Sequence, residues 1–143
     1  MPISFEYKKN SNLIESKISG VLHFEEIAEY FIKLNNEIAL APNFVEIVDF
    51  NDADDLVLTF TALNKLSELY QELTAKGHQI TLFCAYNNHA QGILDMMMPL
   101  FHTMKINVLV CKSEQELKTN ISIFKSFMAN NSFKPVREKA SGT

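Results

Sequence analysis

Cysteine, glycine, proline and tryptophan are scarce in this chain, and each shortage excludes a class of protein. The 143 residues include two cysteines, four glycines, four prolines and no tryptophan. Cys84 and Cys111 are too few for a disulfide scaffold. Each lies in an apolar run, so we expect two buried free thiols in a reducing cytoplasm. So few glycines nearly exclude a phosphate-cradling loop, and P-loop and dinucleotide motifs are missing.

An excess of positive charge and long apolar runs are missing as well. Lys and Arg number 13 against 17 Asp and Glu, which gives a formal net charge of −4 and excludes a general nucleic-acid binder. No apolar run reaches the roughly 18–20 residues that cross a bilayer, and the N-terminus lacks the features of a secretory signal. The composition is that of one globular domain. We expect this domain over residues 1–129 and a polar C-terminal tail over residues 130–143.

Hydrophobic periodicity predicts alternating strands and helices. Apolar residues alternate in the first two short runs, and a four-residue polar turn joins these runs as a hairpin. Later runs are either apolar at nearly every position, as in buried strands, or carry apolar residues at helical spacing. The predicted strands are 3–8, 13–19, 44–50, 79–86 and 106–111, and the predicted helices are 23–40, 59–77, 87–104 and 113–128.

The order β-β-α-β-α-β-α-β-α predicts a single α/β domain. We expect a mixed, mostly parallel five-stranded sheet with four helices, in which the first strand pairs antiparallel. Gly20 should close the second strand, Pro42 should stop the first helix, and Pro99 should break or kink the third helix. Ser113 and Glu116 form a capping box at the start of the last helix.

Four aspartates lie in the segment VDFNDADDLVLT (48–59), which we expect to form a loop between the third strand and the second helix. The crevice of a parallel sheet lies beyond the carboxyl ends of its strands. This loop and the segment AYNNHA, after the fourth strand, should therefore meet at one edge. The candidate ligand- or partner-binding residues are Asp49, Asn51, Asp52, Asp54, Asp55, Thr59, Tyr86, Asn87 and His89.

Metal-binding and catalytic uses of these residues fit poorly. An EF-hand would place Ala53 at an oxygen-ligand position and Phe60 at the position of the bidentate glutamate. A receiver-type phosphoacceptor at Asp49 would need an acidic pair after the first strand, which is missing. The four histidines form no i, i+4 pair, and there is no C-x-x-C motif, so zinc is not expected. Cys84 lies inside a strand, which argues against a Cys84–His89 hydrolase. We therefore expect neither an enzyme nor a cofactor.

Local structure and partner binding remain as uses for the acidic segment. Carboxylates that precede a helix favour its positive end and accept hydrogen bonds from its free N–H groups. Asp55, Thr59 or Thr61 could each cap the second helix. An acidic surface would also suit a basic patch on a protein partner, and both uses stay open.

The order and landmarks of the chain resemble those of the SpoIIAA-like family, relatives of the STAS domain. The segments that carry the resemblance are GVLHFEE, IVDFNDADDLVLT, ITLFCAY and INVLVCKSEQEL, within roughly residues 3–128. The resemblance implies a STAS-like fold and a regulatory module that contacts a protein partner through the loop before the second helix. STAS domains of the anti-sigma antagonist class carry a phosphorylated serine in an Asp-Ser-Ser-Gly motif at the start of that helix. Thr59 lies nearest to this position and is the candidate phosphoacceptor, although the motif's Asp and Gly are missing here.

A second interpretation is a carrier of a small apolar molecule or lipid, which a distant similarity to SEC14-type folds would allow. The segment ILDMMMPLFHTM supports it, because methionines adapt to irregular apolar surfaces and Pro99 could hold a helix away from the sheet. Ordinary core packing would explain the same segment. The surplus of Met and Phe could also be buried against a second copy of the chain, which predicts a homodimer.

Overall fold

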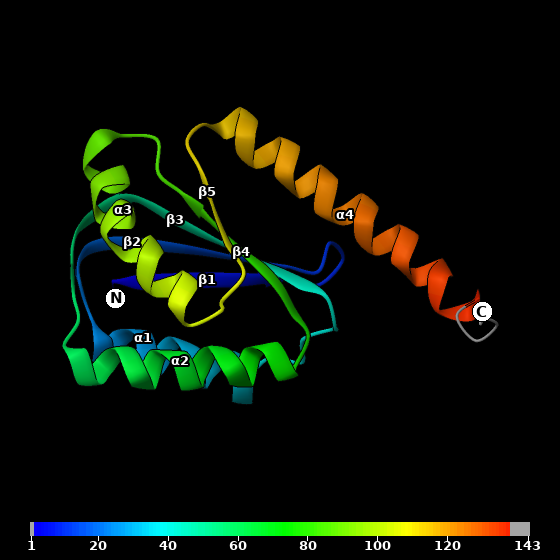
Figure 1. The fold of residues 1–143 in the computed structure, drawn as a ribbon, viewed down its shortest axis with the longest axis horizontal. Helices are drawn as coiled ribbons and strands as arrows, with labels where there is room; N and C mark the ends of the chain where they lie inside the picture. The colour runs from blue at the N-terminus through cyan, green and yellow to red at the C-terminus, as the bar shows by residue number, and fades with distance from the viewer. Residues whose placement is uncertain (1, 138–143) are drawn as a thin grey trace.

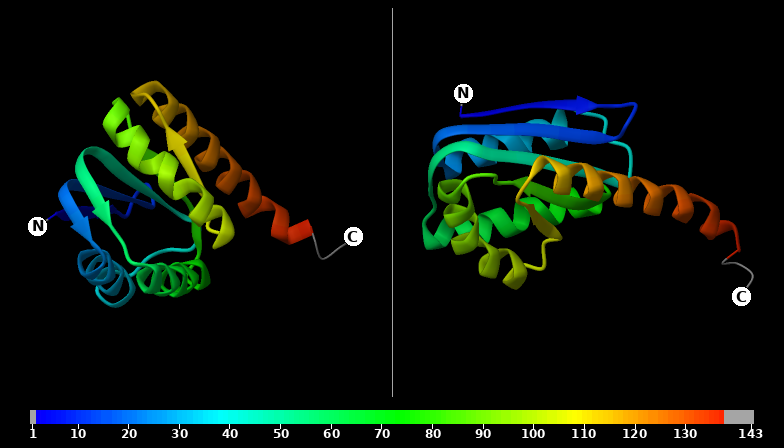
Figure 2. Two further views of the ribbon diagram at one scale, coloured as in Figure 1. Left: turned by 60° about the vertical axis from the view of Figure 1, so that its left-hand side comes forward. Right: turned by 90° about the horizontal axis from the view of Figure 1, so that it is seen from above.

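A five-stranded sheet forms the centre of the domain, with three helices packed on one face and one helix on the other (Figure 1, Figure 2). In the computed structural model, the backbone is described for residues 2–137, and the side chains for residues 2–59 and 61–126. The strands are β1 (Ile3–Lys8), β2 (Leu13–His23), β3 (Phe44–Val57), β4 (His78–Cys84) and β5 (Val108–Cys111). The helices are α1 (Phe24–Asn36), α2 (Phe60–Ala75), α3 (Asn88–Thr103) and α4 (Glu114–Arg137). The predicted order of elements is confirmed.

The strands lie in the sheet in their order along the chain, from β1 to β5. β1 and β2 pair antiparallel, because the short turn between them reverses the chain; Asn12 in this turn has a φ of 54°. Each of the other pairings is parallel, because a helix returns the chain to the same end of the sheet. The sheet is therefore mixed, and the predicted antiparallel pairing of the first strand is confirmed.

The aspartate segment is mostly strand, so the prediction of a loop there is wrong. β3 continues to Val57 and pairs with an equally extended β2 as far as His23. Gly20 consequently does not close β2. It has a φ of 72° and lies beside a register shift in the pairing with β3. Mutual pairing satisfies the backbone of both extensions, while Phe50 and Ala53 face the core and the aspartates between and after them face outwards.

Two helices differ from their predicted form. α3 is continuous from Asn88 to Thr103 with Pro99 inside it, so the proline does not end the helix. Leu94 and Phe101, on either side of the proline, are both buried in the core, and this packing stabilises the two halves in one helix. α4 continues to Arg137 instead of ending at residue 128, because helix hydrogen bonds are internal and do not require core contact. The predicted tail is thus helical as far as residue 137, and residues 138–143 lie outside the described residues.

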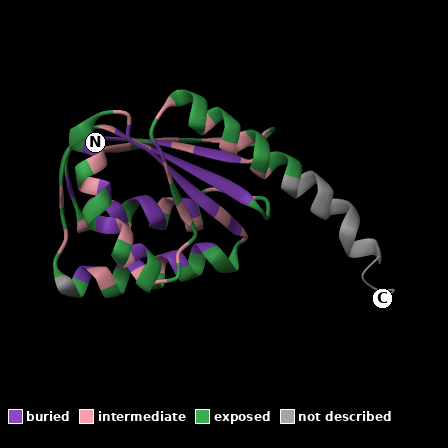
Figure 3. Ribbon diagram, turned by 45° about the horizontal axis from the view of Figure 1, so that its top comes forward, coloured by how far each residue is buried: buried purple, intermediate pink, exposed green. Residues whose placement is uncertain are grey.

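Two hydrophobic layers hold the sheet, and the strands are the most buried part of the domain (Figure 3). The larger layer packs α1, α2 and α3 on one face and includes the aromatic contacts of Phe31 with Tyr70 and of Phe83 with Phe101. The smaller layer packs α4 on the other face, over Leu82, Cys84 and Cys111 among others. Both thiols are free and buried, as predicted.

Candidate functional site

Two chain segments meet at the carboxyl end of the sheet, and we call them the rim segments: residues 51–59, which end β3 and lead into α2, and residues 86–89, which follow β4. The amide of Tyr86 donates to Asn51 Oδ1 at 2.6 Å, and Asn87 Nδ2 donates to the carbonyl oxygen of Asn51 at 3.1 Å. His89 Nε2 donates to the carbonyl oxygen of Asp54 at 2.6 Å. These bonds place the two predicted segments side by side.

The aspartates of the first rim segment take part in local bonding to different degrees. Asp55 Oδ1 accepts from the amide of Leu56 at 2.8 Å. Asp52 forms a 3.0 Å ion pair with Lys17 on β2, and its hydrogen bond and charge raise the pKa of the lysine. The side chain of Asp54 is exposed. Asp54 and Asp55 therefore present carboxylates to solvent just before α2.

Two residues of the candidate set are helix caps. Thr59 Oγ1 accepts from the amide of Ala62 at 3.1 Å at the start of α2, and Asn87 Oδ1 accepts from the amide of Ala90 at 2.8 Å at the start of α3. Each side chain satisfies one of the N–H groups that a helix leaves free at its first turn. The structure thus decides among the predicted caps of the second helix in favour of Thr59.

Asp49 and Tyr86 belong to a different surface from the exposed rim residues. Both line a groove of about 610 Å³ between the second face of the sheet and α4, together with Lys17, Glu114 and Leu117 among others. Asp49 Oδ1 accepts from both the amide and the side chain of Asn51, at 2.9 and 2.8 Å. Burial and the neighbouring Cys84 raise the pKa of the Tyr86 hydroxyl. The candidate set is therefore divided between the exposed side of the rim segments and this groove, and Tyr86 belongs to both a rim segment and the groove wall.

The thiols lie in surroundings that disfavour a nucleophile. Burial raises the pKa of Cys84 to about 11 and also raises that of Cys111, so both are protonated at neutral pH. Within the part of the chain that the structure describes, no group of three or more His, Cys, Asp or Glu side chains is arranged to hold a metal ion.

A polar cluster inside the larger core layer was not predicted from the sequence, and we call it the core network. At its centre is the fully buried Glu46 of β3. Thr81 Oγ1 donates to Glu46 Oε1 at 2.5 Å, the hydroxyl of Tyr30 donates to Oε2, and the hydroxyl of Tyr70 lies 3.5 Å from Oε1. The ion pairs found among the described residues do not include Glu46. Hydroxyl donors therefore compensate this buried acid.

Two further residues, Ser16 and His78, extend the core network, and the donor in each of their hydrogen bonds can be assigned. Because the Tyr30 hydroxyl donates to Glu46, Ser16 Oγ donates in turn to Tyr30 at 2.7 Å. His78 Nε2 lies 2.8 Å from Thr81 Oγ1 and donates to it for the same reason. Burial lowers the pKa of His78, opposed by the charge of Glu46, so the ring is neutral at pH 7. Every donor in the network thus points towards the carboxyl group.

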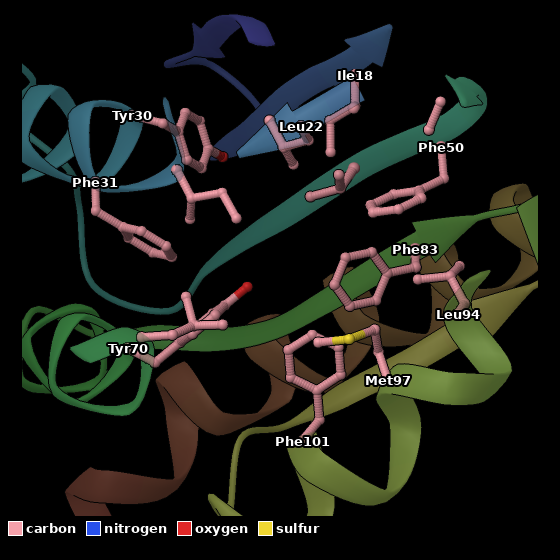
Figure 4. Close-up of a cluster of buried hydrophobic side chains, with 14 of the residues drawn as sticks. Ile18, Leu22, Tyr30, Phe31, Phe50, Tyr70, Phe83, Leu94, Met97 and Phe101 are labelled. Carbon is pink, nitrogen blue, oxygen red and sulfur yellow. The ribbon is translucent and has the colours of Figure 1, made fainter. Parts of the chain in front are cut away.

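A cavity of about 60 Å³ adjoins the core network, and Figure 4 shows the buried side chains around it. Its wall includes Glu46, Tyr30 and Tyr70, and the other described residues that line it are apolar. Met97 and Phe101 of α3 line one side. Leu56 and Leu58 separate the cavity from the rim, because their side chains point inwards from the first rim segment while Asp54 and Asp55 are exposed.

One signal in the sequence could have revealed the core network. Glu46 is the single charged residue in the run FVEIV, and alternation along a strand places it on the same face as Val48. A strand that is apolar on both faces offers no solvent to a carboxylate, so Glu46 must find donors inside the protein. Tyr30 on the preceding helix and Tyr70 on the following helix were suitable donors, but which residues reach Glu46 depends on the packing.

Comparison with known proteins shows similarity at the level of the fold. No protein-family model matches the chain, and no curated protein matches it. Among solved structures, the crystal structure of a sulfate transporter family protein from Wolinella succinogenes is similar, with a TM-score of 0.54 and 15% sequence identity. The similar region covers 79% of this chain and 87% of that one. This likeness supports a STAS-like fold, as the sequence resemblance implied. None of the described helices is long and apolar enough to span a bilayer.

Proposed function

We propose that this protein is a non-catalytic regulatory module of the SpoIIAA-like type, which contacts a protein partner through the rim segments. The observation that carries the proposal is the set of hydrogen bonds between residues 86–89 and the acceptors Asn51 and Asp54, which holds the two rim segments in one surface before any partner arrives. A surface held in this way loses little conformational entropy on binding. We place the protein in the cytoplasm, where free thiols persist.

The charge of the rim indicates a basic partner surface. Asp54 and Asp55 are exposed, and the nearby Lys17 is already paired with Asp52. Complementary charge across an interface chiefly raises the rate of association and improves specificity. We therefore expect the partner to present Lys or Arg side chains to Asp54 and Asp55.

Charge reversal tests this proposal. The double variant Asp54→Lys/Asp55→Lys should lose the partner captured by the wild-type protein from its native cell, whereas Glu68→Lys/Glu72→Lys, on the exposed face of α2, should retain it. Binding by the wild type should also weaken as the salt concentration rises. Equal capture by both double variants would contradict the assignment of the rim as the binding surface.

Thr59 acts in this proposal as a cap, and a phosphate switch is not required. Its hydroxyl oxygen already accepts from Ala62, and the carboxylates of Asp54 and Asp55 would repel a phosphate placed there. Replacing Thr59 with Ala should lower the free energy of unfolding by about 1 kcal/mol, while Thr59→Ser should leave it nearly unchanged. Partner binding that is switched by Thr59→Glu but unaffected by Thr59→Ala would instead favour phosphorylation.

The alternative of a lipid carrier finds limited support in the size of the interior space. The cavity beside Met97 measures about 60 Å³, whereas pockets for drug-sized ligands measure roughly 300–1,000 Å³. Native mass spectrometry of protein purified from its own cells would detect a retained lipid directly.

The homodimer also stays a prediction: Met96 on α3 is 78% exposed and offers an apolar contact, and sedimentation at high concentration would test it.

A further inference from the structure

The hydroxyl of Tyr70 is the least satisfied member of the core network. Its hydrogen bond to Glu46 Oε1 measures 3.5 Å, which is the outer limit for such a bond, and the hydroxyl of Thr81 is its other polar neighbour. Thr81 reaches the same oxygen at 2.5 Å. The Tyr70 side chain is nevertheless buried, so water from the bulk does not compensate it. Its hydroxyl can donate a stronger bond to any oxygen that enters the adjoining cavity.

The rest of the cavity is apolar. Its wall on the side of the sheet includes Ile18, Leu22, Phe50 and Phe83, which are labelled in Figure 4. Val48 of β3 also lines the cavity. A buried water needs two to four polar partners, and this wall offers them only where Tyr30, Glu46 and Tyr70 lie. Water alone would therefore leave most of the space poorly solvated. A molecule that is polar at one end and apolar over the rest suits this cavity better.

We propose that the cavity is a binding site for a small uncharged molecule that carries one hydroxyl group on a compact apolar body. The ligand hydroxyl accepts a hydrogen bond from Tyr70 and donates one to Glu46. A hydroxyl has one donor and can also accept, so it can bond to both groups at once. A cavity of about 60 Å³ admits a molecule of roughly four to six non-hydrogen atoms, since a single water needs about 10–15 Å³. A protonated amine fits less well, because its three N–H groups would need more acceptors than this end of the cavity provides.

The position of the cavity indicates a route of entry. Leu56 and Leu58 form its wall towards the rim, and the connection between β3 and α2 at residues 58–59 is neither strand nor helix. Movement of the Leu58 side chain would widen the cavity on this side without breaking the sheet. Binding here requires no protein partner, so failure of one proposal leaves the other intact.

Titration with 2-methylpropan-1-ol, followed through methyl NMR signals of the intact protein, tests the proposal. Saturable shifts are expected for methyl groups of Ile18, Leu22 and Val48. Tyr70→Phe should weaken binding about fivefold, because one buried hydrogen bond is lost, while Tyr7→Phe, a tyrosine outside the cavity, should bind like the wild type. Val48→Ile, which fills space and keeps the network, should abolish binding.

The comparison compounds separate other occupants from the proposed one. 2-Methylbutane, which lacks the hydroxyl, should bind wild type and Tyr70→Phe equally. Linear shifts without saturation, equal affinity of the alcohol for wild type and Tyr70→Phe, or tighter binding of 2-methylpropan-1-amine would overturn the proposal. NMR contacts between bound water and the same methyl groups would overturn it too, if these contacts persist after the alcohol is added. Coincident thermal unfolding curves of wild type and Tyr70→Phe would exclude misfolding as the cause of weaker binding.

Discussion

Glu46 on β3 and Thr81 on β4 are register partners in the sheet, and their side chains share a 2.5 Å hydrogen bond where neither residue is exposed to solvent. A buried carboxyl group destabilises a fold unless hydrogen bonds compensate its lost hydration. Here Thr81 supplies one bond from the neighbouring strand, and Tyr30 of α1 supplies another. The core network therefore joins the sheet to the helix layer through a single acid.

Truncating Glu46 should be strongly destabilising. Glu46→Ala removes the carboxylate that accepts from the hydroxyls of Thr81 and Tyr30, and we expect the free energy of unfolding in urea to fall by about 3–5 kcal/mol. Glu46→Gln keeps one acceptor oxygen and should cost about 1–2 kcal/mol. The exposed Glu68→Gln on α2 is the control and should change stability by less than about 0.5 kcal/mol. Wild-type stability of Glu46→Ala would show that the network is energetically unimportant.

The hydrogen bond from the Tyr86 amide to Asn51, which joins the rim segments, should be detectable through the hydrogen exchange of that amide. Asn51→Ala removes the acceptor of the Tyr86 amide, so we expect faster hydrogen exchange at Tyr86 and a loss of about 1–2 kcal/mol in stability. Asn88→Ala, at a neighbouring exposed position, should leave that amide protected. Unchanged exchange at Tyr86 in Asn51→Ala would mean that the two segments are not joined in solution.

Stability should fall in mildly acidic solution because of His78. Burial lowers the pKa of His78 in the folded state below its ordinary value of 6.5, so the unfolded chain binds the proton more readily. Above pH 6.5 the His78 ring is neutral in both the folded and the unfolded state, so its burial does not reduce stability. As the pH falls from 6.5 towards the lowered pKa of the folded state, the unfolded chain gains the proton first and stability is lost progressively. Urea unfolding between about pH 7.5 and 5.5 should show this slope. His78→Gln should flatten it, whereas the exposed His102→Gln should keep it.

The cysteines should resist thiol reagents in the native protein. Cys84 and Cys111 are buried, and burial raises the pKa of both thiols, that of Cys84 to about 11. Reaction with a chromogenic disulfide at pH 8 should therefore follow the rate of unfolding. In Met96→Cys, at a position that is 78% exposed, one additional thiol should react at once. Immediate reaction of the wild-type cysteines would show that these strands open readily.

Much of the architecture is readable from local pattern. The periods of apolar residues predicted, in order, the nine elements found in residues 2–137, because the side-chain repeat of a strand or helix is a property of neighbouring residues. The meeting of residues 51–59 with residues 86–89 also followed from topology, since parallel strands end at the same edge. Thr59 was recognised as a candidate cap for the same reason, because capping involves residues three apart.

Other features depend on neighbours that are distant in the sequence. The aspartate segment resembled a loop because Asp disfavours strands, but the extended β2 supplied a pairing partner for its backbone. Glu46 is a single charged residue within an apolar strand, and only packing brought Tyr30, Tyr70 and Thr81 to it from three different elements. The cavity beside them could not be predicted from the sequence either, because an unfilled volume depends on how side chains from many elements pack together. Local periodicity therefore determined which elements form, and tertiary contacts decided how far β3 extends and what its buried acid binds.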